Sequence, residues 1–82
     1  MIELGISKVA DTGEYRVYYR LNGVDDEGKA YYTDDRRDAA NTLVSILNRL
    51  ESQGEGAVIA PYRMTYAVLE QEGYGNLLGS RG

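Results

Sequence analysis

The chain contains neither cysteine nor histidine among its 82 residues. Without these side chains it cannot form a disulfide framework, a Cys/His zinc site, a thiolate nucleophile or a histidine general base. It also lacks phenylalanine and tryptophan, so all eight aromatic residues are tyrosines, whose hydroxyl groups need water or a hydrogen-bond partner. These absences exclude several classes of enzyme and point to the surface of the protein as the place of its function.

Long apolar runs are absent as well. No run approaches the roughly 20 residues that span a bilayer. The first residues, Met1 to Ile6, lack the pattern of a secretory signal, which is a basic stretch followed by an apolar one. The lack of cysteine is consistent with a reducing compartment. We therefore expect a cytoplasmic protein without a membrane partner.

The charge balance is acidic, with 13 Asp and Glu residues against 9 Lys and Arg residues, which gives a net charge of −4. A net negative charge repels nucleic acids and anionic membranes and favours a partner with a basic surface. A chain of this length folds as one domain, residues 1–82, and buries about 60–65% of its unfolded surface. Such a domain has little room for a deep catalytic pocket.

Apolar and polar residues alternate in three segments, which predicts strands over residues 2–9, 14–22 and 29–33. The alternation is clearest in the second segment, where residues 15, 17, 19 and 21 point to one side. Turn-forming residues at Asp11 to Glu14 separate the first two strands, which are therefore expected to form a hairpin. The third strand follows a loop that begins at Asn22-Gly23, and the three strands are expected to form an antiparallel meander.

Residues 35–53 carry apolar side chains at helical spacing, which predicts one amphipathic helix. Asp34 or Asp35 can accept hydrogen bonds from the free N–H groups of its first turn, and Gly54 suits the position after its last turn. We expect the apolar stripe of this helix to cover the side of the sheet that carries residues 15, 17, 19 and 21. The opposite face of the sheet is then open to water.

The segment after Gly56 is compatible with two structures. Residues 61–72 form either a helix, with Pro61 in the first turn and Gly73 after the last, or a strand with alternating tyrosines. The ending Ala-Val-Leu-Glu-Gln-Glu favours the helix. Residues 73–82, with four glycines and no periodicity, are expected to form an irregular, flexible tail that either stays free or orders on a partner. The predicted fold class is thus α+β, a three-stranded antiparallel β-meander packed on one amphipathic helix.

Six carboxylates are concentrated in one part of the sequence, three in the second loop and three at the start of the helix. The two groups lie at opposite ends of the third strand, so a continuous patch spans about 15 Å of one sheet edge. Such a patch imitates the phosphates of a nucleic acid and can enter a basic groove. Each acid also has a local role available to it, in a solvated loop or a helix cap. The residues predicted for partner binding are Asp25, Asp26, Glu27, Tyr31, Asp34, Asp35 and Asp38.

The open face of the sheet offers a second candidate site. Arg16, Tyr18 and Arg20 lie on this face, and the third strand is expected to add Lys29 and Tyr31 beside them. Tyrosine rings flanked by guanidinium groups can stack on single-stranded bases, although the net charge of −4 opposes nucleic-acid binding. The same residues also suit a protein interface or ordinary cross-strand packing.

No catalytic constellation, metal site or cofactor motif is found in the sequence. The serine hydroxyls have no histidine to activate them, and the Asp25 to Gly28 segment does not follow the spacing of a calcium loop. The glycine pair Gly73 and Gly75 lacks the strand-turn-helix context of a phosphate loop. We therefore expect a protein that is not an enzyme and that uses no metal and no cofactor.

In size, charge and element order, the chain resembles the small phage-encoded proteins that inhibit host defence nucleases, the anti-CRISPR group. The resemblance implies a non-enzymatic inhibitor that docks on a basic, nucleic-acid-binding protein surface in the cytoplasm of the host cell. Two alternatives stay open. One is a single-stranded nucleic-acid binder that uses the open sheet face, and the other is a structural component that assembles through sheet edges or the tail.

Overall fold

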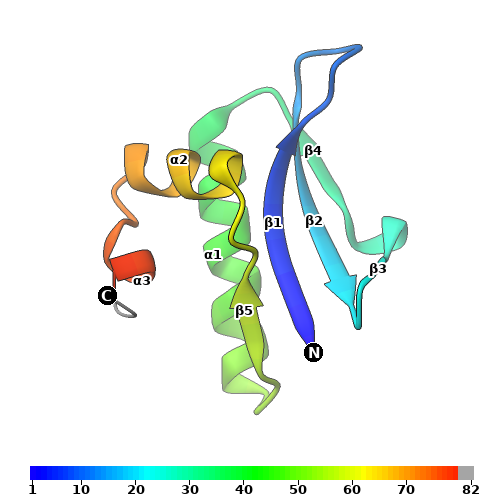
Figure 1. The fold of residues 1–82 in the computed structure, drawn as a ribbon, viewed down its shortest axis with the longest axis vertical. Helices are drawn as coiled ribbons and strands as arrows, with labels where there is room; N and C mark the ends of the chain where they lie inside the picture. Colours follow the sequence, from blue (N-terminus) through cyan, green and yellow to red (C-terminus); the bar gives the residue numbers. More distant parts are fainter. Residues whose placement is uncertain (80–82) are drawn as a thin grey trace.

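One long helix packs against a mixed five-stranded sheet in the computed structural model, which describes residues 1–79 of the chain (Figure 1). The strand order is β3-β2-β1-β5. β4 also pairs with β2, but with the half of β2 that β3 does not pair with. The strands are β1 Ile2–Lys8, β2 Tyr15–Leu21, β3 Val24–Asp25, β4 Tyr31–Thr33 and β5 Ala57–Ile59. The helices are α1 Arg36–Ser52, α2 Arg63–Gln71 and α3 Asn76–Gly79, with a 3₁₀ turn, η1, at Glu27–Lys29.

The three predicted strands are confirmed as an antiparallel meander. β1 pairs with β2 from Ile2 opposite Leu21 to Lys8 opposite Tyr15, and β4 pairs with the first half of β2. The predicted loop at Asn22-Gly23 is a tight turn into the short strand β3. Both turn residues have a positive φ, 53° and 86°, as the favoured two-residue hairpin turn requires.

β5 is an addition to the predicted sheet. It pairs in parallel with β1, with Ala57 opposite Ile2 and Ile59 opposite Leu4. The chain reaches this position because α1 leads it back along the sheet, so β5 starts at the same end as β1 (Figure 1). Three apolar residues are too few to show a period, and only the pairing with β1 makes them a strand.

α1 confirms the predicted amphipathic helix. Asp35 caps it, because its side chain accepts hydrogen bonds from the backbone N–H groups of Arg37, at 2.9 Å, and Asp38, at 3.4 Å. Gly54 follows the last turn with a φ of 79°, a conformation that favours glycine. The helix packs its apolar stripe against β1 and β2, and the core formed in this way includes Ile2, Leu4, Ile6, Val17, Ala39, Ala40, Leu43, Leu47 and Leu50.

The segment after β5 is helical, as the favoured alternative predicted. α2 begins at Arg63 and not at Pro61, and Gly73, with a φ of 90°, follows its end. Residues 73–79 are more regular than the predicted tail, because α3 forms there and Leu78 packs into the core with only 4% of its surface exposed. Residues 80–82 of the predicted tail lie outside the described residues.

The first turn of α2 takes the place of a strand beside β1. β5 ends at Ile59, and the Ala60 N–H still donates to the Leu4 carbonyl, at 2.8 Å. Further along β1, the Thr65 hydroxyl accepts from the Ile6 N–H at 2.9 Å and donates to the Ile6 carbonyl at 3.2 Å. Thr65 is completely buried. The backbone N–H and C=O groups at the edge of β1 therefore have hydrogen-bond partners where β5 no longer pairs with β1.

Candidate functional site

The face of the sheet opposite α1 is less open than predicted, because Tyr18 covers its centre. Tyr18 lies opposite Gly5 in the register of β1 and β2, and its ring lies over this glycine. Only 4% of Tyr18 is exposed, and burial raises the pKa of its hydroxyl. The Arg20 guanidinium covers the ring at 4.8 Å from its centre. Tyr18 is therefore part of the packing of this face and offers no free ring for stacking on a base.

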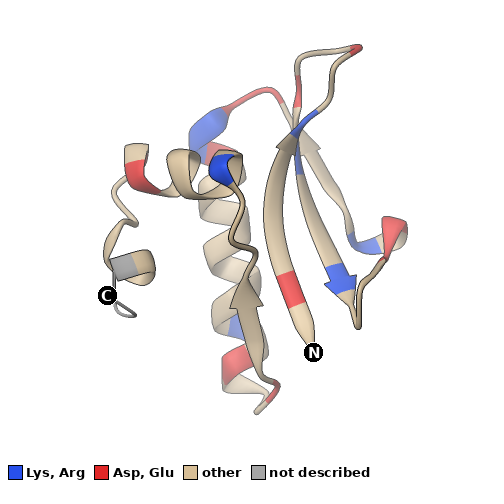
Figure 2. Ribbon diagram, viewed as in Figure 1, with Lys and Arg blue, Asp and Glu red and all other residues tan. Residues whose placement is uncertain are grey.

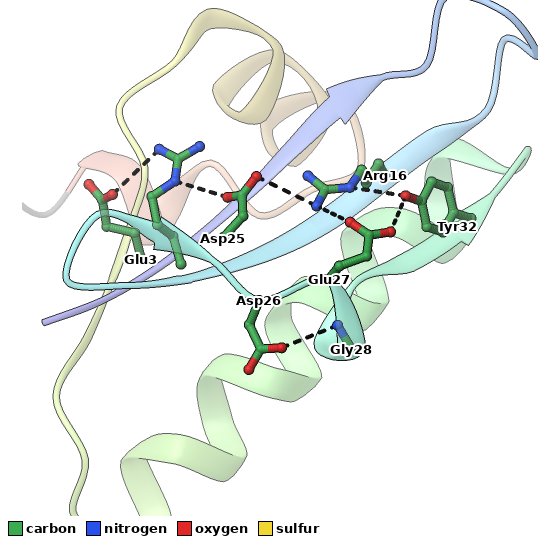
Figure 3. A network of polar contacts seen from close by, with 8 residues as sticks. Glu3, Arg16, Asp25, Asp26, Glu27, Gly28 and Tyr32 are labelled. Carbon is green, nitrogen blue, oxygen red and sulfur yellow. Dashed lines mark hydrogen bonds and ion pairs between the residues drawn. The ribbon is translucent and has the colours of Figure 1, made fainter.

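Arg16 and Arg20 form ion pairs on the same face (Figure 3). Arg16 contacts Glu27 at 2.7 Å and Asp25 at 3.6 Å, and Arg20 contacts Asp25 at 3.0 Å and Glu3 at 3.7 Å. Hydrogen bonds to Glu27 and Asp25 raise the pKa values of Arg16 and Arg20, respectively. These contacts hold the loop that carries β3 and η1 against β2. We call this chain of contacts the sheet-face network, which consists of Glu3, Arg20, Asp25, Arg16, Glu27 and Tyr32.

Tyr31 and Lys29 lie on the other face of the sheet from Arg16, which corrects the predicted nucleic-acid face. The register puts Tyr32, and not Tyr31, opposite Arg16, and opposite residues share a face. The ammonium group of Lys29 lies 5.4 Å from the ring centre of Tyr19, on the α1 side. Alternation in the sequence cannot decide which of two consecutive tyrosines faces the helix, because that choice depends on the pairing of β4 with β2.

The six predicted carboxylates lie along one edge of the sheet, in the segment from β3 to the first turn of α1. Asp25 and Glu27 belong to the sheet-face network. Asp26 caps η1 by accepting a hydrogen bond from the N–H of residue 28 at 3.2 Å, and Asp35 caps α1. The local roles that the sequence left open as an alternative are therefore present for these four acids.

The remaining two carboxylates, Asp34 and Asp38, lie near the start of α1. Asp38 accepts a hydrogen bond from the Tyr31 hydroxyl at 2.6 Å, whereas Asp34 is exposed and its side chain has no partner within residues 1–79. The two arginines after residue 35 pair with Glu72, at 2.8 and 3.4 Å. Basic and acidic segments alternate along this part of the chain, because Lys29 lies between the two acidic groups and two arginines follow residue 35 (Figure 2).

β4 presents two tyrosines at this edge, one on each face of the sheet. Tyr31 is 40% exposed and Tyr32 is 43% exposed. Each hydroxyl donates to a carboxylate, Tyr31 to Asp38 of α1 and Tyr32 to Glu27 of η1. The first contact raises the pKa of Tyr31, and the second lowers the pKa of Glu27. We call Tyr31, Tyr32, Glu27 and Asp38 the tyrosine edge.

Tyr32 was not among the residues predicted for binding. The available signal was the Tyr31-Tyr32 pair in a short strand, because consecutive strand residues must point to opposite faces. Two tyrosines in such a strand therefore place one ring on each side of the sheet. The prediction selected one of the two rings where the structure exposes both.

Within residues 1–79, no group of three or more acidic side chains is placed to hold a metal ion, and no helix is long and apolar enough to cross a membrane. A comparison with protein-family models, with curated proteins and with solved structures finds no match for this chain. The function must therefore be inferred from the surface of the chain itself.

Proposed function

We propose that the protein is a small, non-enzymatic binding module that docks on a basic surface of a partner protein through the tyrosine edge. The observation that supports this proposal is that Tyr31 and Tyr32 remain exposed while carboxylates hold both of their hydroxyl groups. Tyrosine is among the residues that dominate the binding energy of protein interfaces. Rings that are already held in one orientation lose little side-chain entropy on binding.

The carboxylates around the tyrosine edge fit a basic partner. In the ion pair between Arg16 and Glu27, the side chain of Glu27 is 66% exposed and that of Arg16 is only 15% exposed. A partner that approaches this edge therefore meets the carboxylate before the arginine. Exposed charges at the rim of an interface speed the encounter with an oppositely charged surface and suppress binding to wrong partners.

A basic groove that holds a nucleic acid is the kind of surface that this edge fits, because carboxylates spaced along it can take the places of phosphates. The net charge of −4, the small size and the order of elements are also those of the phage-encoded inhibitors that the chain resembles. We extend the proposal accordingly to an inhibitor of a nucleic-acid-binding protein, such as a defence nuclease, in the cytoplasm of a host cell.

Replacing both Tyr31 and Tyr32 with alanine is expected to abolish binding to the partner, because the change removes both aromatic anchors of the edge. The measurement is a pull-down at low salt with wild-type and variant baits, followed by mass spectrometry of the retained proteins. The matched control is Tyr62→Ala, which removes a tyrosine that is 51% exposed and lies outside the tyrosine edge. A protein that the wild type, the double variant and the control retain equally contradicts the proposal.

Replacing Asp26 and Asp34 with lysine is expected to weaken binding to that partner by about tenfold or more at low salt. The loss is expected to shrink as salt is added, because exposed charges are screened over about 10 Å at 0.1 M ionic strength. The measurement is the dissociation constant by titration calorimetry at several salt concentrations. Asp25 is a poor target, because a lysine there faces Arg16 and Arg20 and disturbs the sheet-face network.

The matched control for this charge reversal is the double variant Glu51→Lys/Glu55→Lys. It changes the net charge by the same amount at the end of α1 and before β5, away from the tyrosine edge. We expect this control to bind the partner nearly as well as the wild type. An equal loss in both double variants would show that net charge, and not this edge, governs binding.

A further inference from the structure

β5 is an edge strand with a free side. It lies at the end of the strand order and pairs with β1 on one side, and no strand within residues 1–79 pairs with its other side. The Ala60 N–H donates to the Leu4 carbonyl, so alternation directs the backbone groups of Val58 and Ala60 toward β1. The N–H and C=O groups of Ala57 and Ile59 then point away from the sheet. Such a row of polar groups is a template for one more strand.

A groove of about 490 Å³ lies beside this free side. β5 lines one side of it, and Leu47 of α1, Tyr66 of α2, and Leu77 and Leu78 of α3 line most of the rest, together with Glu51. In Figure 1, α1 lies behind β5, and α3 lies on the far side of α1 from the centre of the sheet. The lining is thus mainly apolar, with a carboxylate at the α1 side.

We propose that this groove binds an extended segment of a partner protein, with apolar residues at alternate positions and a lysine or arginine at one end, as an additional strand beside β5. In this mode of recognition, main-chain hydrogen bonds supply affinity, and pockets for alternate side chains supply specificity. Ala57 and Ile59 lie opposite Ile2 and Leu4 of the core, so their side chains are on the face of the sheet that α1 covers. An added strand also has one face on this α1 side. Its side chains on that face enter the groove and need apolar character.

The carboxylate of Glu51 determines the charge that the groove favours in its occupant. Glu51 lines the groove, whereas Glu55, two residues before β5, lines a separate hollow with Lys29 and Arg49. Neither side chain forms an ion pair or a hydrogen bond with any residue from 1 to 79, in contrast to Asp25 and Glu27 at the other edge, which pair with arginines. An exposed carboxylate without a partner among residues 1–79, at the α1 side of an apolar groove, favours a basic residue at that place in the bound segment.

A second copy of the chain fits the groove less well than such a segment. To enter it, the copy would have to insert its own β5, and residues 55–62 contain no lysine or arginine to meet Glu51. That strand is also flanked by α3 of its own chain, whereas a single extended segment brings no further element with it. The charge of the groove therefore favours a basic segment of a different protein.

The groove and the tyrosine edge lie at opposite ends of the strand order. Binding at β5 leaves the edge formed by β3, η1 and β4 accessible, so this inference goes beyond the proposed function and does not depend on it. A failure of one leaves the other intact, and the double charge reversals at the two edges serve as controls for each other.

The test uses a library of random peptides displayed on phage and panned against the full chain. We expect enrichment of peptides that alternate apolar residues and carry a lysine or arginine near one end. A synthetic copy of an enriched peptide is expected to shift the amide NMR signals of Ala57 and Ile59. It is also expected to bind about tenfold more weakly to the Glu51→Lys/Glu55→Lys variant. No enrichment relative to an unrelated protein, or binding that this variant leaves unchanged, overturns the proposal.

Two further variants distinguish strand addition at β5 from peptide binding at another surface of the chain. Asp26→Lys/Asp34→Lys makes the same change in net charge at the other edge, and it is expected to bind the peptide within about twofold of the wild type. Ala57→Pro removes one outward N–H at the first residue of an edge strand, a place where proline is tolerated, and it is expected to weaken binding by about tenfold. Unchanged peptide binding by a folded Ala57→Pro variant overturns the strand addition.

The folding of each variant is checked by circular dichroism. If Ala57→Pro does not fold, the two charge variants still decide between binding in the groove and binding elsewhere. Analytical ultracentrifugation of the wild type shows whether the chain forms a dimer, and so tests whether a second copy occupies the groove. A dimer that the Glu51→Lys/Glu55→Lys variant fails to form would show that a second copy occupies the groove, and it would overturn the assignment to a partner segment.

Discussion

Replacing Thr65 with valine is expected to lower the free energy of unfolding by about 2–4 kcal/mol. Valine has nearly the same shape as threonine, but it has no hydroxyl to bond to the N–H and C=O groups of Ile6. Both groups lie in a buried region, because Thr65 is fully buried and Ile6 is 1% exposed. Each buried backbone group without a partner costs about 1–3 kcal/mol. Equilibrium unfolding in urea measures the loss.

The matched control is Thr65→Ser, which keeps the hydroxyl and removes one methyl group. Its expected cost is about 1 kcal/mol, the transfer free energy of that group. Amide hydrogen exchange adds a local measurement, since the N–H of Ile6 is expected to exchange faster in the valine variant than in the serine variant. Equal stability of the two variants would mean that the contact of the hydroxyl with β1 contributes little.

Replacing Gly5 with alanine is the second change with a large expected effect, a loss of about 1–3 kcal/mol in the free energy of unfolding. A Cβ atom at this position would lie 2.3 Å from both Cζ and the hydroxyl oxygen of Tyr18. The ring must move to avoid this clash, but it is buried between the sheet and the arginine side chains that flank it. Thermal unfolding is a suitable measurement, because 1 kcal/mol shifts the melting temperature of such a domain by about 4–8 °C.

A double-mutant cycle tests whether the ring of Tyr18 causes this loss. In the background of Tyr18→Ala, the Gly5→Ala change has no ring to meet, and its cost is expected to disappear. Gly56→Ala is the control for glycine replacement as such, because no atom lies within 4 Å of the position that its Cβ would take. If Gly5→Ala costs the same with and without the ring, another contact is responsible.

Both predictions concern the region that separates the two candidate binding surfaces. Thr65 holds α2 against β1 next to the groove at β5, and the pair of Gly5 and Tyr18 supports the sheet-face network. A partner that binds only at the tyrosine edge is expected to tolerate Thr65→Val once the variant is folded. Stability and binding can therefore be measured as separate properties of the chain.

Most of the regular structure follows from local patterns in the sequence. The alternation in β1 and β2, the turn residues between them and the capped amphipathic stripe of α1 each act over a few residues, and each is found where it was predicted. The Asn22-Gly23 turn is another local signal, because both residues tolerate the positive φ that the turn needs. These features define the α+β class and the order of the main elements.

The candidate sites depend on pairings between distant parts of the chain. The predicted acidic residues do gather along one edge, but arginines from β2 pair with two of them, and the sequence does not show these contacts. The strand register decided that Tyr32, and not Tyr31, lies beside Arg16. The expectation of an open face failed at Tyr18, because a glycine on the neighbouring strand leaves room for its ring.

The sequence by itself determined which side chains are missing, and with them the cysteine and histidine chemistry that is excluded, and the local elements from which the protein is built. A residue type that is absent excludes its chemistry in any fold. The periodic patterns follow from backbone geometry, which is also independent of the fold. Only the tertiary structure decided that residues 57–59 become an edge strand, that Thr65 replaces a strand beside β1, and which carboxylates have no ion-pair partner among residues 1–79. These outcomes require contacts between residues up to 59 positions apart, which a local pattern cannot encode.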